Sequence, residues 1–322
     1  MTPIYGNDDL LAQIRTMAAR GRLPHAVLFH GARGMGRKTL ARYYAKTALC
    51  TGQDAPCGQC ASCRKIDHES HPDLIIVPHS GKRSGFSVET VRSVVKDAIV
   101  APNDGARKVY LFGDCDAIDP RSQNTLLKLT EEPPPHVLLV FTAEHRNVFL
   151  TTMLSRMMPL AVRPCTEAEC LQALEQDHGI AHSDALAAAA ACGGNIGTAL
   201  EWLDSRTLQD LTRAAAALTE AVSVRRQYDI LRLLAAFEKD RQTAMTLLRL
   251  LDAQVRDSLV LKYGQDTGLM GCDRRSAEAL SRTVTASRAA AMHRAIQTAW
   301  DALQANVSTR VTLAALGWEL LS

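Results

Sequence analysis

Aromatic residues, net charge and long apolar runs are all scarce in this sequence. Aromatics make up 5% of its 322 residues, and the formal net charge is +3. So small a charge does not indicate a nucleic-acid-binding protein, because any basic surface would have to be local. No apolar stretch approaches the roughly 20 residues that cross a bilayer, and no charged-then-apolar leader opens the chain. We therefore expect a cytoplasmic protein without a membrane segment.

Cysteine is not scarce, and its distribution is uneven. Of nine cysteines, Cys50, Cys57, Cys60 and Cys63 follow the spacing C-x6-C-x2-C-x2-C, which offers enough thiolates for a closed tetrahedral zinc site. Because no secretory signal is present, metal binding is favoured over disulfides. A bacterial iron–sulfur run would need a further cysteine soon afterwards, and the residues after Cys63 supply none. The cluster therefore predicts a structural zinc site.

The first half of the chain alternates between short apolar runs and helix-length segments. The runs at 25–30, 73–79, 108–113 and 136–142 have the length and character of buried strands. Ser87 and Asp119 stand where helices would begin, and both are good N-cap residues. Strands and helices in turn predict an α/β fold, with a parallel sheet covered by helices on both faces.

Strand patterns disappear after Pro164. Three short helical patterns separated by glycines follow, and long amphipathic patterns with almost no proline continue from about residue 205 to the end. We predict three domains. An α/β domain covers 1–165 with the cysteine module inserted at 50–63, a small helical domain covers 166–205, and a C-terminal all-helical domain covers 206–322.

The stretch GARGMGRKT, residues 31–39, lies between a predicted strand and a predicted helix. A phosphate-binding loop there needs G-x-x-x-x-G-K-[ST], in which the lysine reaches the phosphates and the hydroxyl holds Mg²⁺. Arg37 and Lys38 follow the second glycine instead, and an ammonium cannot coordinate Mg²⁺. Shifting the register by one would put side chains at the glycine positions. The loop is therefore a relic turn, a nucleotide site without turnover, or an active site, with candidate residues Gly31, Gly34, Gly36, Arg37, Lys38 and Thr39.

A second segment, KVYLFGDCDAI, bears on the same question. A P-loop ATPase places a Mg²⁺-binding Asp and then a catalytic Glu at the end of such a strand. This chain has Gly113 and Asp114 at those positions. Asp114 comes one residue late, and in a strand that shift would point its side chain to the other face. We therefore predict no ATP hydrolysis by this chain.

A longer run, SQNTLLKLTEEPPPHVLLVFTAEHRNVFLTTMLSRM at 122–157, together with HAVLFHGARGMG upstream, resembles the bacterial clamp-loader family. That family contains the gamma/tau and delta-prime subunits of the DNA polymerase III holoenzyme. The resemblance is dense over roughly residues 5–205 and only architectural beyond. It implies an AAA+ α/β domain, a helical lid, and a helical collar that assembles a five-subunit ring. It also implies a zinc module at the position of the cysteine cluster.

The resemblance also assigns roles to single residues. It implies that Arg156, next to Ser155, is an arginine finger reaching across a subunit interface to the ATP of a neighbour. Met157 stands where the family has cysteine. Gly197 stands where ATPase members carry a lid arginine that senses the γ-phosphate. A chain that lacks the parts serving its own nucleotide but keeps the part serving a neighbour's resembles delta-prime more than gamma/tau.

The function implied by this resemblance is a non-hydrolysing stator subunit of a clamp loader, without ATP binding of its own. Its implied partners are ATPase gamma/tau-like and delta-like subunits, the sliding clamp, and primed DNA through the complex. Two alternatives stay open: an ATPase clamp-loader subunit with an unusual loop, and a stand-alone zinc-bearing DNA-binding protein. The run SGKRSG (80–85) is a candidate phosphate-contacting loop, although charged glycine–serine loops are mostly only solvated.

Overall fold

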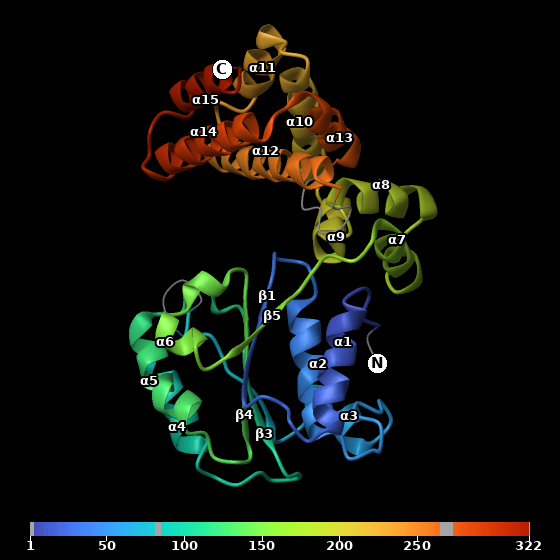
Figure 1. Cartoon of the computed structure of the whole chain (residues 1–322), viewed down its shortest axis with the longest axis vertical. Helices are drawn as coiled ribbons and strands as arrows, with labels where there is room; N and C mark the ends of the chain where they lie inside the picture. Colours follow the sequence, from blue (N-terminus) through green and yellow to red (C-terminus); the bar gives the residue numbers. More distant parts are fainter. Residues whose placement is uncertain (1–2, 81–84, 265–272, 322) are drawn as a thin grey trace. The chain divides into compact units, whose positions relative to one another are not determined.

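The computed structural model describes residues 3–80, 85–264 and 273–321, in two compact units, Met1–Arg163 and Pro164–Ser322 (Figure 1). The units are considered one at a time. Most of the basic run SGKRSG, including Lys82 and Arg83, lies outside the described residues. Within the described ranges, no helix combines the length and apolar character needed to cross a membrane.

The first unit is built on a parallel sheet, as the alternating pattern predicts. In the described part of the chain, the strand order is β2-β3-β4-β1-β5, and every neighbouring pair is parallel. The strands are β1 (Ala26–His30), β2 (Leu74–Ile76), β3 (Lys108–Phe112), β4 (Val137–Ala143) and β5 (Met158–Ala161).

Helices cover both faces of this sheet (Figure 1). Alternate residues of a strand point to opposite faces, so Val109 and Leu111 join one buried cluster while Tyr110 and Phe112 join the other. The first cluster includes residues of α1 (Asp8–Ala19), α2 (Arg37–Leu49) and α3 (Ala61–Asp67). The second includes residues of α4 (Val88–Asp97), α5 (Pro120–Glu131) and α6 (Thr151–Leu154). The predicted α/β architecture is confirmed.

Two helix starts were predicted from single residues, and both are confirmed. The hydroxyl of Ser87 accepts a hydrogen bond from the Thr90 N–H at 3.2 Å, at the start of α4. A carboxylate oxygen of Asp119 accepts one from the Arg121 N–H at 2.7 Å, at the start of α5. Each cap satisfies a backbone donor that the first turn of a helix leaves without a partner.

Strand β5 was not predicted, and Pro159 explains why. Proline cannot donate to a strand ladder and is confined to sheet edges. β5 is an edge strand next to β1, with Pro159 opposite Leu28. The Val162 N–H just after β5 donates to the His30 carbonyl at 2.7 Å. Because N–H direction alternates along a strand, the nitrogen of Pro159 faces away from β1.

The second unit is helical in its described residues. The helices of its first part are α7 (Glu167–Gln176), α8 (His182–Cys192) and α9 (Ile196–Asp204). The next part contains α10 (Arg206–Ser223), α11 (Gln227–Ala235), α12 (Arg241–Lys262), α13 (Arg274–Thr283), α14 (Ala286–Gln304) and α15 (Thr309–Glu319). A buried cluster from Leu211 to Leu320 forms the core of this next part. The boundary between a small domain ending at 205 and a C-terminal domain stays a prediction.

Candidate functional site

The glycine-rich loop joins β1 to α2. Gly34 and Gly36 have φ values of +86° and +82°, a left-handed conformation that favours glycine. Gly31 is needed for a different reason, because a Cβ there would lie 2.5 Å from the backbone oxygen of Val162. Gly31 therefore lets the chain beyond β5 pass closely, which is a packing role.

The two cations that open α2 face carboxylates of the same unit. The Nζ of Lys38 lies 2.5 Å from the Oδ2 of Asp114. The guanidinium of Arg37 lies 3.8 Å from carboxylate oxygens of both Asp114 and Asp116, and its side chain is 7% exposed. Within the described residues, the buried Nη1 of Arg37 makes no hydrogen bond. The cationic positions of the loop are thus paired internally.

The expectation that Asp114 would point away from the loop is wrong. Strand β3 ends at Phe112, and Asp114 lies beyond it in a left-handed conformation with φ +47°, so the alternation of a strand does not apply. The Thr142 hydroxyl at the end of β4 accepts a hydrogen bond from the Asp114 N–H at 2.8 Å. This turn directs the Asp114 carboxylate to Lys38.

A hollow of about 440 Å³ lies over this ion-pair cluster. Side chains of both signs line it, so it offers an incoming phosphate no strong excess of positive charge. Of the predicted loop residues, the lining includes all but Gly31. The complete lining is Arg33, Gly34, Gly36, Arg37, Lys38, Thr39, Asp114, Asp116 and Glu144.

The polar contacts of Arg156 are with residues outside the ion-pair cluster of the glycine-rich loop. Its Nη1 donates to the Thr152 carbonyl at 2.5 Å and to the Ser155 hydroxyl at 3.1 Å. Its Nη2 forms an ion pair with Glu131, the last residue of α5. The side chain of Arg156 is 33% exposed. An arginine held this way keeps its charge at the surface of the α/β unit.

Two acidic residues of these sites were not singled out from the sequence. Asp116 accepts a hydrogen bond from the Glu144 N–H at 2.6 Å and pairs with Arg37. Glu131 pairs with Arg156. The only sequence signal for Glu131 is its place in the EEPPP turn, and Asp116 carries none. Gly197, predicted to replace a lid arginine, lies in the first turn of α9.

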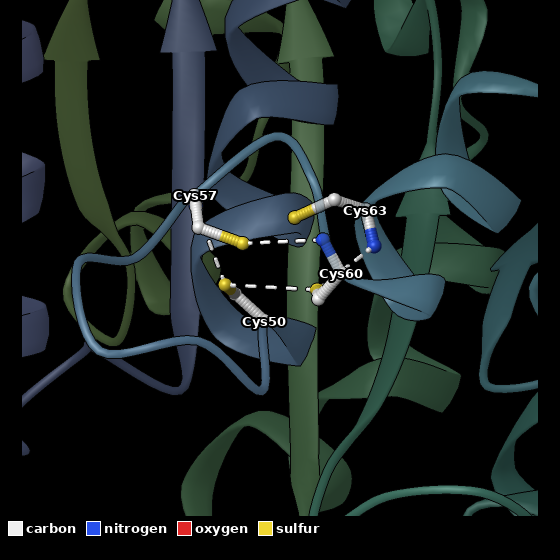
Figure 2. A group of neighbouring side chains, drawn as sticks. All are labelled: Cys50, Cys57, Cys60 and Cys63. Atoms are coloured by element: carbon white, nitrogen blue, oxygen red, sulfur yellow. Dashed lines mark hydrogen bonds between the residues drawn. The ribbon is translucent and has the colours of Figure 1, made fainter.

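The four clustered cysteines do come together (Figure 2). Their sulfur atoms all lie within 4.8 Å of one another, and the Sγ atoms of Cys50 and Cys60 are 3.9 Å apart. A tetrahedron with Zn–S bonds of about 2.3 Å has sulfurs roughly 3.8 Å apart. The donor set and its spacing therefore fit zinc. Gly52 makes this possible, since a Cβ there would lie 2.8 Å from the sulfur of Cys57.

Backbone amides surround these sulfurs. The N–H groups of Gly52 and Cys57 lie 3.3 Å from the Cys50 sulfur, and the Cys60 N–H lies 3.3 Å from the Cys57 sulfur. Burial opposes ionisation of Cys60, but backbone and side-chain hydrogen bonds from Thr51 and Cys63 outweigh it and lower its pKa to about 5. N–H donors from Gln59 and Cys60 also lower the pKa of Cys57, whereas burial raises the pKa of Cys50 and of Cys63. The hydrogen bonds thus favour the thiolate form that a metal requires at two of the four cysteines.

Comparison with known proteins gives one family match. A family model described as DNA polymerase III, delta subunit, matches residues 6–166. This segment includes the glycine-rich loop, the cysteine cluster and Arg156. It corresponds closely to the first compact unit.

Several known proteins are similar to parts of the chain. The tau subunit of DNA polymerase III from Escherichia coli (strain K12) is 33% identical over 184 residues, covering 56% of this chain and 28% of that protein. The tau subunit from Bacillus subtilis (strain 168) is 28% identical over 155 residues, covering 48% and 27%. The chain thus spans little more than a quarter of the length of these curated relatives.

Among solved structures, a DNA polymerase III gamma subunit-related protein from Thermotoga maritima gives a TM-score of 0.43 at 14% identity, covering 96% of this chain and 98% of that chain. The clamp loader delta protein of Bacillus subtilis gives a TM-score of 0.39 at 10% identity, covering 97% and 99%.

Proposed function

The chain belongs to the bacterial clamp-loader AAA+ family, in the group described as DNA polymerase III, delta subunit, and from this premise we propose that it is a non-hydrolysing, delta-prime-like stator subunit. The observation that carries the proposal is the ion-pair cluster of the loop. Lys38 occupies the position of a Mg²⁺-binding hydroxyl and neutralises Asp114. The chain's own site therefore supplies neither a hydroxyl nor a free carboxylate for the Mg²⁺ that phosphoryl transfer needs.

Arg156 is the group that acts on a neighbour in this proposal. Its planar guanidinium fork suits phosphate oxygens. Its contacts and partial exposure support a role in which it reaches the γ-phosphate of ATP held by an adjoining subunit. There it would stabilise negative charge as it develops in the transition state.

Zinc has a structural role in this proposal. Four cysteine ligands fill a tetrahedral site and leave no position for a substrate. Bound zinc would hold the segment from Cys50 to Cys63, which contains only the first turn of the short helix α3 and little core of its own.

The proposed partners follow from the same role. A stator needs an ATPase subunit of the gamma/tau type against its α/β unit and a delta-like subunit to complete the ring. The assembly would load the sliding clamp, and primed DNA would be contacted through the complex.

Mg²⁺-dependent ATP hydrolysis by the purified chain, with and without primed DNA, tests the first half of the proposal. We expect no turnover above a blank. Turnover abolished by Arg37→Ala would overturn the stator and make the chain an ATPase subunit. In a loader reconstituted from the same organism's subunits, we expect Arg156→Ala to lower clamp loading by on the order of 10²-fold or more.

A further inference from the structure

We propose that Glu131 is a positioning residue for Arg156, holding its guanidinium in the orientation in which it meets the neighbour's ATP. This inference rests on the proposed function. Its basis is the ion pair between Glu131 at the end of α5 and Arg156 just after α6. Neither the loop cluster nor the zinc module takes part.

Buried contacts hold the two segments in register. The Gln123 side chain of α5, 1% exposed, donates to the Val148 carbonyl at 2.9 Å and accepts from the Leu150 N–H at 2.7 Å. The Thr130 hydroxyl lies 3.8 Å from the sulfur of Met153, with both residues buried. Thr130 is adjacent to Glu131, so the backbone that carries the carboxylate is fixed relative to α6. The ion pair between Glu131 and Arg156 therefore lies at the surface end of a buried contact between α5 and α6.

The hydrogen bonds of Arg156 show which of its N–H donors the ion pair leaves available for a phosphate. Arginine has five N–H donors. Three of them face Thr152, Ser155 and Glu131, so two have no partner in the described part of the chain. One of these is on Nη2 and the other is on Nε. A phosphate arriving from a neighbour can use both without displacing Glu131.

Holding a long side chain in one orientation has an energetic consequence. A free arginine loses rotamer entropy when it is ordered. Glu131 orders the guanidinium before the neighbour's ATP arrives. Less rotamer entropy is then lost when the transition state forms. Loss of Glu131 should therefore lower the rate of the chemical step and leave ATP affinity alone.

The test compares variants of this chain in the reconstituted clamp loader, with Mg²⁺–ATP, sliding clamp and primed DNA. We expect Glu131→Ala to lower the kcat of clamp loading about 10-fold, with the KM for ATP and the assembly of the loader unchanged. Glu131→Gln keeps a hydrogen-bond acceptor and should lose less. The matched control is Glu132→Ala, the neighbouring exposed carboxylate, which makes no ion pair in the described residues. It should behave as the unmodified chain.

The double variant Glu131→Ala/Arg156→Ala separates the possible outcomes. If Glu131 acts through Arg156, the double variant is no slower than Arg156→Ala alone. Losses that multiply, an equal loss in Glu132→Ala, or full activity of Glu131→Ala would each overturn the positioning role while the finger stands. Full activity of Arg156→Ala would overturn the proposed function itself.

Discussion

Lys38 and Asp114 illustrate how much a single residue decides in this molecule. With a hydroxyl at position 38, the Asp114 carboxylate would face an open position at the head of α2. With lysine there, an ammonium lies 2.5 Å from that carboxylate. A cation carried by the chain thus stands where a nucleotide-binding loop would recruit a metal.

Gly31 gives a prediction at the same scale. A Cβ on Gly31 would clash with the backbone oxygen of Val162 at 2.5 Å, whereas one on Gly113 would meet ordinary contacts at 3.8 Å. We expect Gly31→Ala to lower the free energy of unfolding by about 1–3 kcal/mol. Gly113→Ala, at the end of β3, should change it by less than about 1 kcal/mol. Urea denaturation measures both, and equal effects would contradict the packing role of Gly31.

At the scale of elements, the cysteine module offers a direct measurement. We expect one zinc per chain in the purified protein and none in Cys60→Ser, because a closed site needs all four thiolates. Without zinc, the segment 50–63 should become sensitive to protease. Cys115→Ala is the control, since Cys115 is buried outside the cluster, and it should keep its zinc. Retention of zinc by Cys60→Ser would disprove the four-cysteine site.

Residues close in sequence allowed most of the helices and strands to be predicted, whereas contacts between distant residues could not be predicted. The strands β1 to β4 and the caps at Ser87 and Asp119 follow from residues close in sequence. Strand β5 was not predicted because Pro159 argues against a strand in its sequence. The direction of Asp114 escaped because a left-handed turn, rather than strand alternation, sets it.

The candidate sites divide in the same way. The cysteine spacing alone predicts a four-thiol cluster, because its ligands lie within one short segment. The pairing of Arg156 with Glu131 joins residues 25 positions apart, and the sequence around either residue does not predict this pairing. Only the fold brings the end of α5 next to the end of α6.

At the scale of the whole molecule, the two compact units give a further prediction. Each has its own buried clusters, so residues 1–163 and 164–322 should each fold when produced alone. We expect a cooperative thermal transition for both fragments by circular dichroism, and zinc only in the first. A first fragment that remains unfolded in the presence of zinc would contradict this division.

The proline in β5 has a consequence for how the protein behaves at high concentration. An unprotected edge strand is a template on which another molecule's strand can pair and start an aggregate. At this edge the outward-facing nitrogen of Pro159 carries no hydrogen, and the opposite edge, β2, is only three residues long. Neither edge offers a long row of donors and acceptors. In the described part of the chain, the sheet therefore gives another copy little edge to pair with, which disfavours aggregation by addition of strands.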